Sequence, residues 1–475
     1  MLFNSFEFVV FFALVLLVYW RLPHRAQNWL LLVASLIFYG SWNSKFLLLI
    51  VASASIDFLC GLGIAGATSQ KKRRAYLVVG LVSSLAILGF FKYANFFLDN
   101  LVELLEVLGV PASRPALNII LPVGITFHTF QAMSYAIDVY RREQEVCRNY
   151  FDYLLYITFF PQLVAGPIER AARLLPQFVN PRPRLNLGAT LESIKLIIVG
   201  YAQKVAIADV LAPTVDDTFA NIHERGGWTL LFGLYAFAIQ IYCDFAGYSN
   251  IARGTARLLG FQLMRNFAQP YLAVNITEFW RRWHISLSTW LRDYLYIPLG
   301  GNRRGRARTY VNLMITMLLG GLWHGASWTF VTWGGLHGSY LAAHKAWTEK
   351  RALRAAAPFD ARSRLKKLAC WLLTFHLVCL AWIFFRAESF ADAWAYLGGM
   401  MRGGTQGFTR EFVEVALYFA LAFGLDFLLE RRRSGRLSVL FSRHWVLETC
   451  ALAGMVAMIL FVGENHVVPF VYFQF

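Results

Sequence analysis

Long apolar runs alternate with short polar connections along almost the whole chain. Spanning a bilayer takes about 20 apolar residues in a helix. Several runs are shorter, so we expect some helices to be tilted, re-entrant or shielded by other helices. The pattern predicts an all-α polytopic membrane protein. The runs lie near residues 6–20, 28–39, 46–64, 75–91, 117–139, 151–168, 189–212, 227–247, 311–343, 368–385, 412–429 and 446–463.

The composition agrees with this class of protein. Apolar residues make up 57% of the chain and charged residues only 15%, whereas soluble domains carry roughly 25% charged residues. The polar connections are too short to form a large soluble domain. We therefore expect residues 1–475 to form a single integral membrane domain.

The basic residues indicate how the chain crosses the membrane. The formal net charge is +17, but the basic residues stand in connections between apolar runs, which is typical of cytoplasmic loops. We expect membrane lipids and no nucleic acid as partners. Counting the runs between clusters places the turn 40–44 and both termini outside the cytoplasm. The clusters are Arg21 with Arg25, Lys71–Arg74, Arg141 with Arg142, Arg303–Arg308 and Arg431–Arg436.

The chain lacks the motifs of several common enzyme and pump classes. It has no H-E-x-x-H, G-x-S-x-G or Walker sequence, which argues against a metalloprotease, a serine hydrolase and a nucleotide-driven pump. Its six cysteines are scattered without a C-x-x-C pair, so we expect no metal site. A G-x-G-x-x-G match at Gly61–Gly66 ends an apolar run and indicates helix packing instead of a nucleotide site.

A histidine stands inside the longest uncharged segment. Residues 311–343 contain no Asp, Glu, Lys or Arg, and Gly320–Gly325 in their middle includes His324. In a straight helix His324 would lie roughly 24 Å from the basic loop that ends at Arg308. Ionisable groups at such depth usually face a bundle interior or a wet cavity, so His324 is a candidate for chemistry or transport. The alternative is a histidine that a neighbouring helix satisfies.

A second histidine lies in a segment rich in tryptophan and arginine. At 100° per residue, residues 277–296 place arginines on one arc and Trp280, Trp283 and Trp290 on the opposite one. We expect one amphipathic helix at the membrane interface that ends at Pro298. An interfacial aromatic belt explains the tryptophans, but it explains His284 less well. The two histidines suggest a pair, although spacing in sequence cannot bring them together.

At these residues the chain resembles the membrane-bound O-acyltransferase superfamily, most closely the membrane subunits of bacterial alginate and related polysaccharide acetylation systems. Many stretches in the same order carry the resemblance, and they cover most of the chain. They are Met1–Ser5, Phe38–Trp42, Leu121–Phe127, Thr129–Gln131, Ile137–Arg141, Phe160–Arg170, Asp244–Ser249, the His284 segment and Gly321–Ala326.

The resemblance implies a fold and two catalytic residues. It implies a helical rim around a thin central region with a funnel or tunnel, which we expect to contain roughly 11 to 14 transmembrane or re-entrant helices with core motifs at about 121–345. His324 matches the catalytic histidine of the family and His284 its second signature position. Asn250 departs from an expected Asp, so we assign it no role, and we interpret His128 as packing.

The resemblance also implies substrates, partners and a location. We expect no bound cofactor and an acetyl thioester, acetyl-CoA or another, as the donor. The implied partners are a soluble extracytoplasmic acetyltransferase and a polysaccharide acceptor, and the implied location is the bacterial inner membrane.

The residues suit this chemistry independently. Acyl transfer from a thioester to a hydroxyl needs a base, which an imidazole such as His324 can supply. The carbonyl oxygen gains negative charge and needs donors, for which the Trp323 indole, backbone N–H groups and a protonated His284 are candidates. We expect Trp280, Trp283, Trp323 and Asp244 to contact substrate. The alternative for Asp244 is pairing with an interfacial arginine.

Two other functions stay open at this point. Within the same fold, the chain could transfer another acyl group such as D-alanine to a cell-envelope polymer. In another class, it could be a transporter or channel with His324 in the path.

Overall fold

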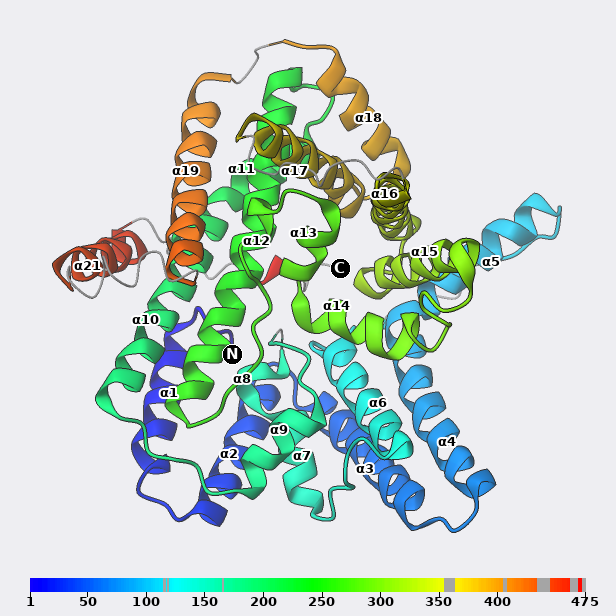
Figure 1. Ribbon diagram of the computed structural model, residues 1–475, viewed down its shortest axis with the longest axis vertical. Helices are drawn as coiled ribbons and strands as arrows, with labels where there is room; N and C mark the ends of the chain where they lie inside the picture. Colours follow the sequence, from blue (N-terminus) through cyan, green and yellow to red (C-terminus); the bar gives the residue numbers. More distant parts are fainter. Residues whose placement is uncertain are drawn as a thin grey trace. The chain divides into compact units, whose positions relative to one another are not determined.

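The computed structural model describes residues 1–113, 117, 119–164, 166–353, 364–404, 408–433, 445–461 and 469–471. Within these residues every regular element is a helix, which confirms the predicted all-α class (Figure 1). The basic cluster expected at 431–436 lies partly outside them.

The chain divides into two compact units. Unit 1 comprises Met1–Ile197 with Ile251–Met264, and unit 2 comprises Ile198–Asn250 with Arg265–Phe475. Two helices, α10 and α12, contribute residues to both units.

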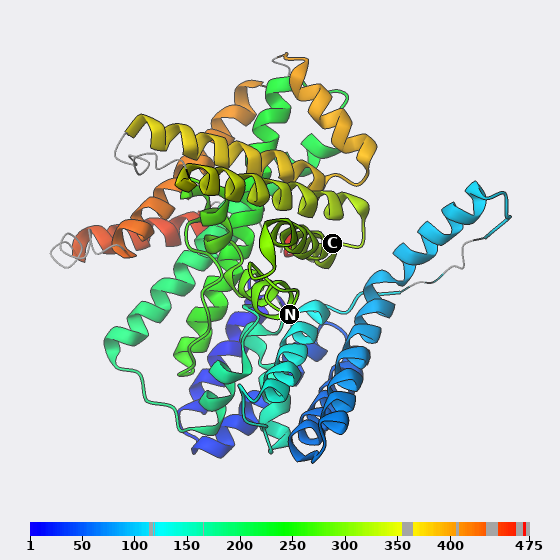
Figure 2. The ribbon, with the colours of Figure 1, turned by 45° about the vertical axis from the view of Figure 1, so that its right-hand side comes forward.

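Unit 1 is built from helices of very different lengths. Helix α4 continues through the π-helix η1 into α5, which extends away from the other helices of its unit in both views (Figures 1 and 2). The elements are α1 Phe6–Tyr19, α2 His24–Gly40, α3 Lys45–Gly66, α4 Gln70–Leu88, η1 Gly89–Tyr93, α5 Ala94–Val107, α6 Ile125–Arg141, α7 Tyr150–Thr158, α8 Phe160–Leu163, α9 Ala171–Val179 and the start of α10 Leu187–Gln203.

Unit 2 contains both histidines singled out in the sequence. The corner between α13 and α14 lies beside α12 (Figure 1), because the rings of Trp283 and His284 pack against Tyr242 and Phe245 of α12. The elements are η2 Lys204–Ala208, α11 Asp209–Ala220, α12 Gly227–Leu258, η3 Pro270–Leu272, α13 Ile276–Arg282, α14 Ile285–Leu291, η4 Arg292–Tyr296, α15 Gly305–His324, α16 Trp328–Leu353, α17 Arg364–Arg386, α18 Phe390–Met401, α19 Phe408–Arg433 and α21 Trp445–Phe461.

Four helical segments of the described residues are long and apolar enough to cross a membrane. They are Lys45–Gly66, Gln70–Val107, Gly227–Leu258 and Arg364–Arg386, and each contains a run predicted from the sequence. Their surroundings differ, because 83% of the apolar window of Gly227–Leu258 is buried against only 17% of that of Gln70–Val107. Helix α12 is therefore a core element, and α4 with α5 is peripheral.

Other predicted runs form shorter or interrupted helices. In the run 117–139, helix α6 begins at Ile125, directly after Gly124, which adopts a positive φ of 75°. The run 151–168 breaks at Phe159, whose backbone leaves the helical region before α8 begins. A π-helix, η2, interrupts the run 189–212. Such interruptions fit the expectation that part of the apolar sequence does not form simple spans.

Candidate active site

The segment around His284 is two short helices, so the predicted continuous helix over 277–296 is wrong. Helix α13 ends at Arg282, and α14 begins at Ile285. Between them His284 adopts φ 40° and ψ 57°, a left-handed conformation that residues with a side chain rarely adopt. Such backbone conformations persist only where the surroundings enforce them, and they concentrate at functional sites.

Hydrogen bonds from a neighbouring extended segment enforce the break. Ala268 N donates to Arg282 O at 2.9 Å, and Ile285 N donates to Asn266 O at 2.8 Å. The Asn266 side chain also accepts from Ser286 N at 3.3 Å. Backbone groups that a continuous helix would have paired are thus satisfied by residues 266–268. These hydrogen bonds fix the turn between α13 and α14 in which His284 lies.

The charge-free run 311–343 folds back on itself, so it is not one span. Helix α15 ends at His324, and α16 begins at Trp328. Gly325 follows His324 where no side chain fits, because a Cβ there would lie 2.1 Å from Cε2 of Phe330. His324 therefore stands at the end of α15, where the chain turns toward α16.

Two glycines bring α15 and α16 into backbone contact. A Cβ on Gly321 would lie 2.2 Å from the carbonyl oxygen of Phe330, and one on Gly334 would lie 2.2 Å from that of Met317. Small residues allow helices to approach this closely. The position of His324 thus depends on both glycines.

The fold brings the two histidines together. Their ring centroids are 6.4 Å apart, although 40 residues separate them in sequence. The Trp323 ring lies 5.9 Å from His284 and 4.9 Å from His324. His284 is 0% exposed and His324 4% exposed. The two imidazoles and the Trp323 indole form one buried cluster.

The surroundings of His284 are apolar. The Phe245 ring packs edge-on at 4.7 Å, and Phe267 lies 6.4 Å away. Removal from water disfavours the charged ring and lowers the pKa of His284 from 6.5 to about 3. The ring is therefore neutral at physiological pH. This disagrees with a protonated His284 as the donor to a developing oxyanion, and leaves a neutral N–H for that purpose.

Asp244 forms a buried ion pair with a lysine, so pairing with an arginine is not what the structure shows. Lys204 Nζ lies 2.6 Å from Asp244 Oδ1 and 2.7 Å from Asp209 Oδ1. The other oxygen of Asp244 accepts a hydrogen bond from Val471 N at 2.6 Å. Asp244 thus ties α12 to η2 and to the segment at Val471. Its contact with substrate stays a prediction.

Another buried histidine, beside His284 and His324, was missed from the sequence. His337 on α16 is 0% exposed, and its Nδ1 accepts from Trp280 Nε1 at 3.3 Å. The Trp333 ring lies between it and His324, 4.8 Å from one and 5.0 Å from the other. The signal was present, because His337 stands in the same uncharged run as His324.

This region holds buried nitrogen atoms without hydrogen-bond partners. Among the described residues, Nε1 of Trp283, Nε1 of Trp333 and Nε2 of His337 have none. Because Nδ1 of His337 accepts a hydrogen bond, the proton of the neutral ring is on Nε2, so all three nitrogens are donors. Over nine in ten buried polar groups in proteins are paired. Three unpaired donors in one aromatic cluster indicate a place where a ligand with several acceptor atoms, or water, would bind.

These features define a helical membrane protein with a buried pair of histidines beside a cluster of unpaired donors. The chain belongs to the membrane-bound O-acyltransferase family, whose sequence profile matches residues 141–387. This range contains α13 to α16 and both histidines. The protein is a membrane O-acyltransferase.

Similar proteins cover most of the chain. It is 44% identical to the probable alginate O-acetylase AlgI of Azotobacter vinelandii, over 85% of this chain and 79% of that protein. It is 42% identical to the probable alginate O-acetylase AlgI of Pseudomonas aeruginosa, over 85% of this chain and 76% of that protein. It is 36% identical to a peptidoglycan O-acetyltransferase of Helicobacter pylori, over 84% of this chain and 80% of that protein.

Proposed function

We propose that this protein takes an acetyl group from a cytoplasmic thioester and passes it across the bacterial inner membrane for O-acetylation of an exported polysaccharide such as alginate. The observation that carries the proposal is the buried approach of His284 and His324 to 6.4 Å within the region that the family profile covers. The names of the two alginate relatives support the acetyl group and the polymer.

His324 is the general base of the proposed reaction. Its imidazole takes the proton of the acceptor hydroxyl while the hydroxyl oxygen attacks the thioester carbonyl carbon. The new C–O bond forms, the C–S bond breaks, and the thiolate that leaves takes the proton from His324. A base in this role contributes on the order of 10² to 10⁴ in rate.

Neutral donors stabilise the charge that develops on the carbonyl oxygen. The Trp323 indole lies against both histidines, and His284 is neutral, so each ring can present an N–H. Donors fixed in a dry site act without reorganisation at the moment of reaction. The tryptophans expected to contact substrate, Trp280 and Trp283, lie in α13 and directly after it.

The unpaired donors at Trp283, Trp333 and His337 support binding of the thioester donor. An acyl thioester on a pantetheine arm, as in acetyl-CoA, presents amide carbonyls that accept hydrogen bonds. A buried N–H that lacks an acceptor costs roughly 1 to 3 kcal/mol. Bound donor would recover this free energy at each of the three sites.

The basic connections support an orientation with the Arg303–Arg308 loop in the cytoplasm and both termini outside. The acetyl group would then enter from the side of that loop.

We further propose that a separate soluble acetyltransferase outside the cytoplasm completes the reaction. The polar connections of this chain are too short to hold a long hydrated polysaccharide. The chain would thus pass the acetyl group to a hydroxyl on that partner or on a small acceptor.

The test is a reconstitution without a partner. Purified protein in liposomes receives labelled acetyl-CoA and alginate, and polymer-bound label is measured beside consumption of the thioester. The proposal expects thioester turnover once a small hydroxyl acceptor is supplied, and essentially unlabelled polymer. Efficient labelling of alginate by the isolated chain would show that no partner is needed.

Peptidoglycan is a second candidate for the final polymer. The 36% identity to a peptidoglycan O-acetyltransferase extends over 84% of this chain. Deleting the gene and measuring O-acetyl groups on the exported polysaccharide and on peptidoglycan separates the two. Loss of O-acetyl groups from peptidoglycan alone would mean that peptidoglycan, and not alginate, is the final acceptor.

A further inference from the structure

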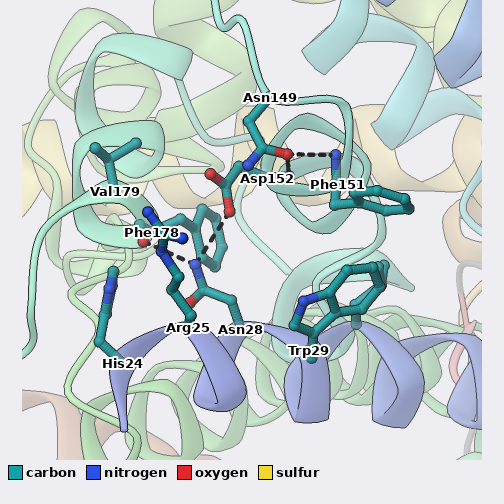
Figure 3. A pocket seen from close by; sticks show the side chains of 10 residues that line it. His24, Arg25, Asn28, Trp29, Asn149, Phe151, Asp152, Phe178 and Val179 are labelled. Atoms are coloured by element: carbon teal, nitrogen blue, oxygen red, sulfur yellow. Dashed lines mark hydrogen bonds between the residues drawn. The ribbon is translucent and has the colours of Figure 1, made fainter.

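A pocket of about 370 Å³ lies in unit 1, far in sequence from both histidines (Figure 3). It is formed where the first turns of α2 and α7 meet the end of α9. Its lining residues are His24, Arg25, Asn28, Trp29, Leu32, Asn149, Phe151, Asp152, Phe178 and Val179.

Hydrogen bonds fix the carboxylate of Asp152 at this pocket. Asn149 caps α7, and its side-chain oxygen accepts from Phe151 N at 2.9 Å and Asp152 N at 3.4 Å. The Asn28 amide nitrogen donates to Asp152 Oδ1 at 3.1 Å and to Phe178 O at 2.9 Å. These contacts engage one carboxylate oxygen of Asp152 (Figure 3).

The pocket combines opposite charges with polar atoms that lack partners. The charged pair is Arg25, which belongs to α2, and Asp152, which faces the same space from α7. Among the described residues, His24 Nε2 and Asn28 Oδ1 are shielded from solvent without a hydrogen-bond partner. A ligand with both a donor and an acceptor would satisfy them.

An exposed apolar track begins at the rim of the pocket. Trp29, Val33 and Ile37 follow one another on α2 at intervals of four residues, so they share one helix face. They are 49%, 50% and 55% exposed. The Phe151 ring, 47% exposed, lies 4.5 Å from that of Trp29. In a membrane protein such a face is covered by lipid, and aromatic side chains gather at the level of the headgroups.

We propose that this pocket binds the headgroup of an aminophospholipid such as phosphatidylethanolamine. Arg25 and His24 hold the phosphate, for which the arginine guanidinium offers paired donors. The ammonium group donates to Asp152. An acyl chain then follows the track Trp29–Val33–Ile37 along α2. Arg25 selects for phosphate, and Asp152 selects for an amine that carries hydrogens.

The track distinguishes this ligand from a soluble one. A nucleotide could place its phosphates at Arg25 and its base on Trp29, but it has nothing to cover Val33 and Ile37. An anionic lipid such as phosphatidylglycerol would cover them, but its headgroup has no cation for Asp152. The amine, the phosphate and the chain together match all three parts of the site.

The test measures lipid retained by the full-length protein in detergent, by native mass spectrometry. Phosphatidylethanolamine, phosphatidylglycerol and phosphatidylcholine with identical acyl chains are added separately at equal concentrations. We expect phosphatidylethanolamine to bind about threefold to tenfold better than the other two, the range of a partly exposed charge-assisted hydrogen bond. Asp152→Asn should abolish this preference, and Arg25→Gln should weaken binding of all three lipids.

Arg21→Gln is the matched control. Arg21 belongs to the same basic cluster, but its guanidinium donates to Leu17 O at 2.7 Å and does not line the pocket. It should leave the lipid preference unchanged. Equal binding of the three lipids to the unaltered protein, or full binding by Arg25→Gln, would overturn the proposal. Equally tight binding of O-phosphoethanolamine, which has no acyl chain, would overturn the assignment to a lipid.

Discussion

His337 is a buried histidine beside the proposed catalytic pair. Its two nitrogens have different surroundings, because Nδ1 accepts from Trp280 and Nε2 is buried without a partner. An asparagine places its oxygen near the position of Nδ1, and a glutamine places its amide near that of Nε2. The two substitutions therefore separate positioning of Trp280 from donation to a ligand.

We expect His337→Gln to keep more activity than His337→Asn. If Nε2–H binds the acyl donor, losing it should raise KM for the thioester by about 5- to 150-fold, which corresponds to roughly 1 to 3 kcal/mol. Steady-state kinetics with varied thioester measure this, and the kcat of His337→Asn should change less than its KM. Wild-type KM in His337→Asn together with a raised KM in His337→Gln would mean that His337 acts only through Trp280.

The pKa of His284 predicts how stability depends on pH. The folded protein keeps His284 neutral down to about pH 3, whereas the unfolded chain takes up this proton near pH 6.5. Stability is thus unaffected above pH 6.5 and falls as pH drops below it, by about 2 kcal/mol at pH 5 for this one group. His284→Asn should lose less stability than wild type between pH 7 and pH 5.

Thermal unfolding in detergent at the two pH values measures this difference. His223→Asn serves as the control, because His223 is exposed and its replacement should leave the pH dependence of wild type. An identical loss of melting temperature in wild type and His284→Asn would show that His284 is not held neutral.

The sequence indicates which single residues are candidates for the site, but not which residues pair with them. His324 stands out in the sequence because it is an ionisable residue in a run without Asp, Glu, Lys or Arg. The same argument applies to His337. The partner of Asp244 could not, because Lys204 lies 40 residues away and on another helix. The position of Asp244 at the end of an apolar run suggests an interfacial arginine as its partner, but does not indicate Lys204.

Apolar runs in the sequence predict where the long helices lie, but they do not predict where a helix breaks. The arcs drawn for residues 277–296 have the same periodicity on either side of His284, so periodicity cannot reveal a break. The hydrogen bonds that stabilise the break involve Asn266 and Ala268, which lie outside the segment 277–296. In the run 311–343 the glycines around His324 gave a local signal for a turn, but they are also typical of close helix packing.

Adjacent glycines of α16 offer a test of the α15–α16 contact. A Cβ on Gly334 would lie 2.2 Å from Met317 O, whereas one on Gly335 would lie 3.4 Å from Leu318 Cδ2, an ordinary contact. We expect Gly334→Ala to force the helices apart at a cost of roughly 1 to 3 kcal/mol and to displace His324, lowering thioester turnover. Gly335→Ala should retain both stability and turnover, since alanine favours helices over glycine.

The melting temperature and the thioester turnover of the two purified variants test this prediction. Wild-type values for Gly334→Ala would mean that backbone contact at this position does not hold His324 in place.

For the whole molecule, the charge pattern predicts an orientation. In a variant whose native cysteines are replaced, Arg306→Cys should resist an impermeant maleimide in intact cells and react after lysis, because basic loops stay in the cytoplasm. Ser44→Cys is the opposite control, since its turn is expected outside and should react in intact cells. Labelling at position 306 in intact cells would invert the proposed topology.

The class of the whole molecule follows from the sequence because hydrophobicity adds up along each run. Four predicted runs, within Lys45–Gly66, Gln70–Val107, Gly227–Leu258 and Arg364–Arg386, are helices of membrane-spanning length. The number of crossings does not follow in the same way, because helices shielded by protein need not be long or uniformly apolar. The 6.4 Å approach of the two histidines is likewise a property of the fold, because the sequence suggests a pair but its spacing cannot bring the two rings together.

In the proposed reaction His324 is the base for acyl transfer and His284 supports it as a neutral donor. The most direct measurement is transfer of labelled acetyl from a thioester to a hydroxyl acceptor by protein in liposomes, comparing wild type with His324→Ala and His284→Ala at equal folded amounts. We predict that His324→Ala loses transfer by on the order of 10² to 10⁴, and that His284→Ala loses less, because water can partly replace a neutral donor. Near-normal transfer by His324→Ala would show that His324 is not the base.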